Sequence, residues 1–275
     1  MRDRSERVDD RDKWTAILLA GSRPGGDPLA QAHGEQFKAR VPIAGEAMIA
    51  RVVRTLAAVE RIGRIVILSQ QPEAVLAGDL AWIAGHPKIR LRTSGAGISR
   101  SIAETAGSGD APWPVLVTTA DHPLLAPSDV ETFIDGVGDA DLAVAMVPRQ
   151  VLLAAYPDNK RTWLNFRDGG FTGANLFALT SPRVAPALDL WASAEQDRKA
   201  ARKLMMRFGP WLAIRALTRT ISLGNALAAA GRRLGIRARA VLLGRAEAGI
   251  DVDKASDFEL VARILETQSP EAGGA

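Results

Sequence analysis

The sequence predicts an α/β fold, in which a mostly parallel, doubly wound sheet carries helices on both faces and a helical insertion follows in the second half. Two observations support this. Short apolar runs alternate with helical patterns through the first half, and the 275 residues are 47% apolar and 24% charged. That length and composition suffice for a buried core, and they exclude a disordered, collagen-like or low-complexity chain.

The first half reads as a series of strand and helix units. The short apolar runs bounded by turn residues predict strands at residues 14–20, 65–69, 89–91, 115–118 and 142–147. Apolar residues recurring at helical spacing predict helices at residues 48–59, 71–84, 99–106 and 129–136.

The second half is less regular. Pro, Asn, Asp and Gly punctuate residues 148–175, which predicts loops projecting from a sheet edge. The elements expected after them are a strand at 175–179, a helix to about Arg207, another from Pro210 to about Gly231, strands at 239–243 and 250–252, and a helix at 256–266 capped by Ser256. We therefore expect one domain over residues 14–268 with a helical insertion at about 183–237, between a disordered tail at 1–13 and a second tail at 269–275.

Charge is unevenly distributed along the chain. The net charge is +4, but residues 183–245 carry 13 Lys and Arg against 3 Asp and Glu. This basic segment suits an anionic partner, including the surface of an anionic membrane, or it forms a helical cap with solvated arginines. Cysteine is absent, which excludes disulfides and thiolate chemistry, and no apolar run is long enough to span a membrane. A cytoplasmic protein is expected.

Two neighbouring segments indicate phosphate binding. The first predicted strand runs into the loop Gly21–Gly26, whose backbone amides can approach an anion closely. Lys38 follows, and then an apolar-Pro-apolar-Ala-Gly run opens a helix. Together these segments resemble the MobA-like nucleotidyltransferases, which have a GT-A-like sheet. The resemblance implies that Gly21, Ser22 and Arg23 wrap a triphosphate and that Lys38 neutralises phosphate charge, with Arg23 and Lys38 catalytic.

Two acidic segments extend the resemblance. Asp121 ends the apolar strand 115–118, and in the family this aspartate binds Mg²⁺, which prefers hard oxygen ligands. An Asp-x-Asp-like element before the last helix supplies the family's second carboxylate. Asp253 is the first choice here and Asp251 the second, because alternate residues of a strand share a face. The alternative for all three aspartates is a structural role in a turn or at a helix start.

Two weaker matches concern the rim of the same pocket. Residues 94–101 resemble the family's base-recognition loop, which makes Gly95 and Ser101 nucleotide-binding candidates; a plain strand-to-helix turn is the alternative. Residues 170–175 resemble the loop that presents an Asn or backbone amides to the acceptor, which makes Gly173 and Asn175 acceptor-binding candidates. Arg167 joins them, with Arg161 close in sequence.

The resemblance implies a Mg²⁺-dependent nucleotidyltransferase. It would join an NTP, CTP or GTP first, to a small phosphorylated polyol, sugar or acid and release pyrophosphate. The alternatives are a glycosyltransferase of related fold and a catalytically silent nucleotide-binding or membrane-docking module. No nucleic-acid partner is expected, since the chain outside the basic segment is net acidic and carries no nucleic-acid motif. The acceptor, the base and the oligomeric state stay open.

Overall fold

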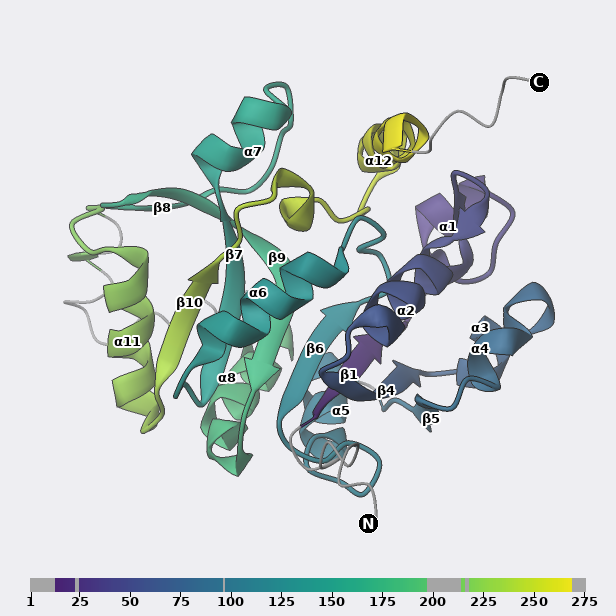
Figure 1. Cartoon of the computed structure of the whole chain (residues 1–275). Helices are drawn as coiled ribbons and strands as arrows, with labels where there is room; N and C mark the ends of the chain where they lie inside the picture. The colour runs from purple at the N-terminus through teal and green to yellow at the C-terminus, as the bar shows by residue number, and fades with distance from the viewer. Residues whose placement is uncertain (1–12, 23–24, 96, 197–213, 216–217, 269–275) are drawn as a thin grey trace, which may run out of the picture.

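The centre of the molecule is a sheet whose strands follow the order β10-β7-β9-β6-β1-β4-β5, with β8 paired to β9 (Figure 1). We describe it from a computed structural model that places residues 13–22, 25–95, 97–196, 214–215 and 218–268. The strands are β1 (Trp14–Leu19), β4 (Ile62–Ser69), β5 (Ile89–Thr93), β6 (Val115–Thr119), β7 (Leu142–Pro148), β8 (Leu164–Phe166), β9 (Gly169–Leu179) and β10 (Ala238–Leu242).

Strand direction is mostly parallel. β1 is parallel to β4 and β6, β4 is parallel to β5, and β10 is parallel to β7. β9 lies between β6 and β7 and runs antiparallel to both. The predicted α/β class and mostly parallel sheet are therefore confirmed, with one long reversed strand joining the two parallel parts.

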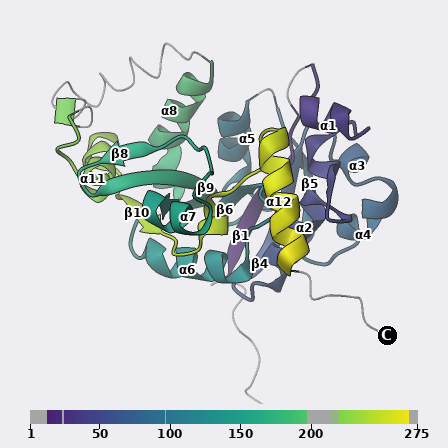
Figure 2. The same cartoon turned by 90° about the horizontal axis from the view of Figure 1, so that it is seen from above.

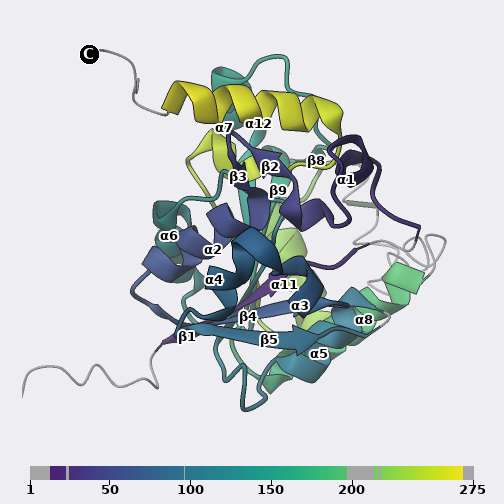
Figure 3. The ribbon, with the colours of Figure 1, turned by 90° about the vertical axis from the view of Figure 1, so that its right-hand side faces the viewer.

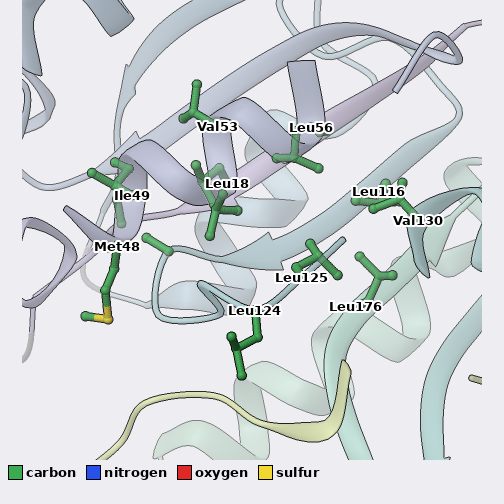
Figure 4. Packing of buried hydrophobic residues seen from close by; sticks show 14 of the residues in the cluster. Leu18, Met48, Ile49, Val53, Leu56, Leu116, Leu124, Leu125, Val130 and Leu176 are labelled. Carbon is green, nitrogen blue, oxygen red and sulfur yellow. The ribbon is translucent and has the colours of Figure 1, made fainter. Parts of the chain in front are cut away.

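The strands are apolar along their length because helices cover both faces of the sheet. In β1, Ala16 and Leu18 pack into one apolar cluster, whereas Ile17 between them packs into another. Successive strand residues point to opposite faces, so these clusters are the two layers of the core. Leu18 belongs to the same buried cluster as Met48 and Ile49 of the first layer (Figure 4).

Two sets of helices form the outer layers. α2 (Met48–Ala58) and α6 (Pro127–Val137) bury their apolar side chains in the first cluster. α5 (Ile98–Thr105) and α8 (Ala185–Gln196) contribute to the second cluster on the opposite face (Figure 3). α11 (Leu223–Leu234) packs beside β10, and its Leu223 joins Met146 of β7, which points away from the first cluster. The described helices of the 183–237 segment thus cover one face of the sheet, and β10 returns the chain to it.

Several further elements, all short except α12, complete the fold. They are α1 (Pro28–Ala32), the 3₁₀ turn η2 (Lys38–Arg40), the hairpin β2 (Pro42–Ile43) and β3 (Glu46–Ala47), α7 (Arg149–Ala155), η4 (Pro182–Val184), η5 (Ala246–Gly249) and α12 (Ala255–Gln268). α12 crosses above the carboxyl ends of β1 and β6, as the view from above shows (Figure 2). The hairpin turns at Ala44 and Gly45, which both have positive φ and so close a tight two-residue loop.

The structure corrects several expected elements. The helix at 71–84 is three pieces, α3 (Pro72–Val75), η3 (Gly78–Leu80) and α4 (Ala81–Ala84), because Gly78 has φ +68° and interrupts the helix. Residues 148–175 are not loops alone, since they hold α7, β8 and most of β9. Residues 250–252 are not a strand, and Ser256 lies inside α12, which begins at Ala255.

Part of the predicted chain lies outside the described residues. This applies to the tail at 1–12, to the segment 197–213 with the expected helix start at Pro210, to residues 216–217 and to the tail at 269–275. Contact of the basic segment with an anionic membrane stays a prediction. Among the described helices, none combines the length and the apolar character needed to cross a bilayer.

Candidate active site

Three charged side chains from distant parts of the chain meet above the carboxyl ends of the parallel strands. The Lys38 ammonium donates to Asp121 Oδ2 at 2.6 Å and to Asp253 Oδ1 at 3.1 Å. Lys38 belongs to η2, Asp121 follows β6, and Asp253 precedes α12. The structure therefore brings together the phosphate-directed lysine and the two first-choice metal ligands inferred from the sequence.

Backbone contacts hold the two acidic segments in register. The Ala120 N–H donates to the Leu19 carbonyl, which continues the β1–β6 pairing to the residue before Asp121. The Val252 N–H donates to the Asp121 carbonyl at 2.9 Å, which joins the residues before α12 to the end of β6. Because Val252 is buried and Asp253 is exposed, the segment is anchored by its apolar residue and presents the carboxylate to solvent.

An arginine supports the turn that carries Asp121. The Arg245 guanidinium donates to the Leu124 carbonyl and to both carboxylate oxygens of Asp129, with the closest Asp129 contact at 2.7 Å. Asp129 is only 4% exposed and also accepts from the Ala126 N–H, so it caps α6 as well. This network fixes the chain from Leu124 to the start of α6.

The electrostatics of the cluster favour a cation. Burial lowers the pKa of Lys38, but the neighbouring Asp121 and Asp253 carboxylates outweigh it, so the pKa lies above its usual 10.5. The other oxygen of Asp121, Oδ1, is buried and has no hydrogen-bond partner among the described residues. Two carboxylates thus converge on one positive charge, and hard oxygen lone pairs remain to be satisfied.

The glycine loop lies at the end of β1 and is held from β4. The Ser22 N–H donates to Gln70 Oε1 at 2.9 Å, and Gln70 Nε2 donates back to the Ser22 carbonyl at 3.3 Å. Gly21 is exposed, and the Ser22 hydroxyl is buried without a described partner. Arg23, which the resemblance makes a candidate for binding the triphosphate, lies outside the described residues.

The predicted base-recognition loop is organised by Ser101. Its hydroxyl donates to the Gly97 carbonyl at 2.7 Å and accepts from the Gly95 N–H at 3.0 Å. Ser101 is buried, whereas Gly95 is exposed. In this arrangement Ser101 shapes the loop, and the exposed backbone around Gly95 is the part open to a ligand.

Asp251, the second-choice metal ligand, faces different partners from Asp253. Its Oδ1 accepts from Arg161 Nη1, and its Oδ2 accepts from Asn175 Nδ2 at 2.8 Å. Burial alone would raise the pKa of Asp251. The opposing effects are larger, so the pKa lies below its usual value: they are the charge of Arg161, the hydrogen bonds from Arg161 and Asn175, and the charge of His122. The structure places Asn175 in this second cluster.

Two other acceptor candidates lie apart from each other. Gly173 is exposed in β9, two residues before Asn175. Arg167 is exposed in the turn between β8 and β9, where its N–H donates to the Ile221 carbonyl near α11. Six strand residues, or about 20 Å, separate Gly169 from Asn175, so the structure does not bring Arg167 to the carboxylate cluster.

His122 lies between the two acidic clusters and is almost fully buried. Burial lowers its pKa, although the charges of Asp251, Asp121 and Asp129 act in the opposite direction. Neither ring nitrogen has a described partner. No group of three or more His, Asp or Glu side chains in the described part of the chain forms a ready metal cage, so Asp121 and Asp253 would need ligands from a substrate or water.

Sequence reasoning missed two supporting residues, Gln70 and Arg245, and it missed the pairing of Arg161 with Asp251. Each acts across at least 48 positions of sequence. Arg161 stands near the acceptor candidates in sequence, and that proximity was its only signal.

Comparisons with known proteins agree with this geometry. A family model of the MobA-like NTP transferase domain matches residues 16–209. A structure described as a hypothetical transferase from Thermus thermophilus is 30% identical, with a TM-score of 0.73, and the match covers 90% of this chain and 99% of that one. A search of curated proteins returned no match.

Two more distant structures share the fold. One is 4-diphosphocytidyl-2C-methyl-D-erythritol synthase from Anaerococcus prevotii, at 11% identity and a TM-score of 0.54. The other is CMP:2-keto-3-deoxy-manno-octonic acid synthetase in complex with CTP, at 16% identity and a TM-score of 0.59. Each match covers 93% of this chain and 99% of the other. With a family match over more than half of its length, the chain belongs to the MobA-like NTP transferase domain family.

Proposed function

We propose that this protein is a nucleotidyltransferase that joins an NTP, with CTP or GTP favoured, to a small phosphorylated polyol, sugar or acid and releases pyrophosphate. The observation that carries the proposal is the junction of Lys38, Asp121 and Asp253 beside the Gly21–Ser22 loop. Family membership and the two CTP-type synthases of the same fold support the reaction class.

The residues at the junction fit Mg²⁺. The donor set is hard oxygen, two carboxylates already converge on one cation, and Asp121 Oδ1 is buried with no described partner. Asp121 and Asp253 would hold the ion together with phosphate oxygens and water. Bound there, Mg²⁺ supplies charge neutralisation and orientation of the triphosphate. In the present structure the Lys38 ammonium takes the position between the two carboxylates.

The protein's own residues then do the remaining work. Backbone N–H groups of the glycine loop and the Lys38 ammonium offset triphosphate charge, and we include Arg23 in this role. The attacking phosphate monoester has its second pKa near ~6, so at neutral pH it is largely dianionic and needs no strong general base. Its oxygen forms a bond to the α-phosphorus while the bond to the bridging oxygen breaks, and pyrophosphate leaves. Positioning and charge neutralisation dominate such a step.

The deciding experiment is a pyrophosphate-release screen. Four NTPs are tested with Mg²⁺ against phosphorylated polyols, sugars and hydroxy acids, and NDP-sugars are included as donors. We expect release with at least one NTP and acceptor pair. In the same assay Asp121→Asn should lose at least about 100-fold in rate with an unchanged melting temperature. Asp135→Asn is the matched control, because Asp135 is exposed and, among the residues that the structure describes, forms an ion pair with Arg61 alone.

Two results would count against the proposal. Transfer from an NDP-sugar without pyrophosphate release would make the protein a glycosyltransferase. Tight NTP binding with no turnover across the acceptor panel would make it a nucleotide-binding module.

A further inference from the structure

Beside the Lys38 junction lies a second polar cluster, built from Asp251, Asn175 and Arg161. They come from the segment before α12, from β9 and from the loop between α7 and β8. The side chains of Arg161 and Asp251 are 11% and 16% exposed. Besides its bond to the carboxylate, Arg161 donates from Nη2 to the Asp251 carbonyl at 2.8 Å. Arg161 thus donates hydrogen bonds to both the side chain and the backbone of Asp251.

This cluster adjoins the proposed reaction site. Asp251 stands two residues before Asp253, and Val252 between them is bonded to the Asp121 carbonyl. Both oxygens of Asp251 are already bonded to its neighbours, so its carboxylate serves Arg161 and Asn175 instead of the Lys38 junction. Asn175 is therefore bonded to the same short segment that carries Asp253.

The backbone of Asn175 has an unusual conformation, which directs its side chain. Asn175 has φ +47°, a left-handed conformation that Asn and Asp adopt far more readily than most side chains. The pairing of β7 with β9 shifts register here, between Val144 and Met146, so Asn175 lies on a β-bulge. Bulges of this kind redirect a side chain out of the regular alternation of the strand.

The bond to Asp251 fixes which end of the Asn175 amide is free. A carboxylate paired with a guanidinium offers only hydrogen-bond acceptors, so the amide must turn its NH₂ group to Asp251. The amide oxygen makes no hydrogen bond to the described residues and is not among the buried unpaired atoms. It is therefore an accessible acceptor, which a donor such as a hydroxyl group can meet.

The cluster also holds an unmet donor. Arg161 Nε is buried and has no partner in the part of the chain that the structure describes. A hydroxyl group can donate to the amide oxygen of Asn175, whereas Arg161 Nε is covered by protein atoms and is not offered to a ligand. A methylene at the same place would leave the amide oxygen unpaired once it lost water, which carries a free-energy penalty.

We propose that Asp251 is a positioning residue that orients Asn175 for a hydroxyl group on the acceptor, so that the acceptor class narrows to phosphorylated polyols and sugars. This rests on the proposed nucleotidyl transfer. It assigns Asp251 no metal, and it makes Asn175 the group that distinguishes hydroxylated acceptors from their deoxy analogues.

The first test compares matched acceptors in the pyrophosphate-release assay. The pairs are ribose 5-phosphate with 2-deoxyribose 5-phosphate, glucose 1-phosphate with its 2-deoxy analogue, and sn-glycerol 3-phosphate with propane-1,2-diol 1-phosphate. We expect at least one pair in which the hydroxylated member is preferred about 10-fold or more in kcat/KM. Asp251→Asn should reduce this preference to below about 3-fold, while the KM for NTP stays constant. Asp158→Asn, an exposed aspartate near Arg161, is the control.

The second test is a reciprocal exchange. Asn175→Asp places two carboxylates face to face and should raise the acceptor KM about 10-fold or more. Adding Asp251→Asn restores a donor and acceptor pair and again leaves an oxygen toward the acceptor, so the double variant should recover most of that loss. Asp tolerates the left-handed backbone, so the exchange preserves the bulge.

The outcomes separate the two proposals. If the wild type uses no acceptor on the panel, the proposed function and this inference both fail. If it turns over acceptors but shows no preference within the pairs, or if the double variant is no better than Asn175→Asp, the inference alone is overturned. It is likewise overturned if Asp251→Asn weakens Mn²⁺ binding, measured by calorimetry, as much as Asp253→Asn does.

Discussion

Removing the Lys38 ammonium tests whether the carboxylate pair is a cation site. In Lys38→Met the carboxylates of Asp121 and Asp253, now 2.6 and 3.1 Å from a single nitrogen, would face each other without a positive charge. Breaking a fully buried ion pair costs about 3–5 kcal/mol, and breaking an exposed pair costs about 0.2–1 kcal/mol. Asp121 is 21% exposed and Asp253 is 55% exposed, so the contacts lie between these limits. We expect a loss of about 1–2 kcal/mol at pH 7.

Added Mg²⁺ should reverse this loss. An ion that binds only the folded protein with a Kd of about 1 mM contributes about 1.4 kcal/mol at about 10 mM. The gain should be larger in Lys38→Met than in the wild type, where the ion must displace the ammonium. Urea denaturation followed by tryptophan fluorescence, with and without Mg²⁺, measures both effects. Lys88→Met is the control, because Lys88 donates to the Ala57 and Val59 carbonyls and to no carboxylate of the site.

The pH dependence of this difference has a definite sign. The pKa of Lys38 is raised in the folded protein, so its stabilising contribution is fully present below its ordinary pKa of 10.5 and disappears as the pH rises through the folded value. The stability gap between wild type and Lys38→Met should be the same at pH 7 and 9 and shrink above about pH 10.5. Equal Mg²⁺ gains in both proteins, or a loss below about 0.5 kcal/mol, would refute the reasoning.

Two further predictions concern the residues that support the site. Arg245→Met leaves a buried carboxylate unpaired and should cost about 3 kcal/mol in urea denaturation, whereas Arg61→Met, which removes exposed pairs, should cost less than about 1 kcal/mol; similar costs would contradict this. Gln70→Ala releases the backbone of Ser22 and should raise the KM for NTP about 3- to 10-fold at an unchanged melting temperature, and an unchanged KM would show that the loop needs no such support.

Much of the fold follows from local patterns. The apolar runs of β1, β6 and β7 and the helical spacing of α2 are visible in sequence because these elements bury one or both faces. The first half of β9 was not predicted, since it extends beyond β6 and three of its first six residues are glycines. Residues 250–252 look like a strand, but Val252 bonds to the single carbonyl of Asp121 and has no strand to join.

The candidate site, like the fold, was predicted only in part. Lys38, Asp121 and Asp253 stand out because each follows a recognisable strand or precedes a recognisable helix. The role of Asp251 could not be predicted in this way, because the same residue pattern fits both a metal ligand and an ion-pair partner of Arg161. Which of them applies depends on the bulge at Asn175 and on the path of a loop with no regular periodicity.

The antiparallel course of β9 lets the protein change the acceptor that it binds at little cost in stability. Its later residues, 176–179, are locked between β6 and β7, whereas its earlier residues project past the end of β6. An added side chain at Gly173 would meet no atom within 4 Å. Mutation there can therefore remodel the wall beside Asn175 while the interior stays intact, so descendants of one ancestral sequence could diverge in acceptor without first losing stability.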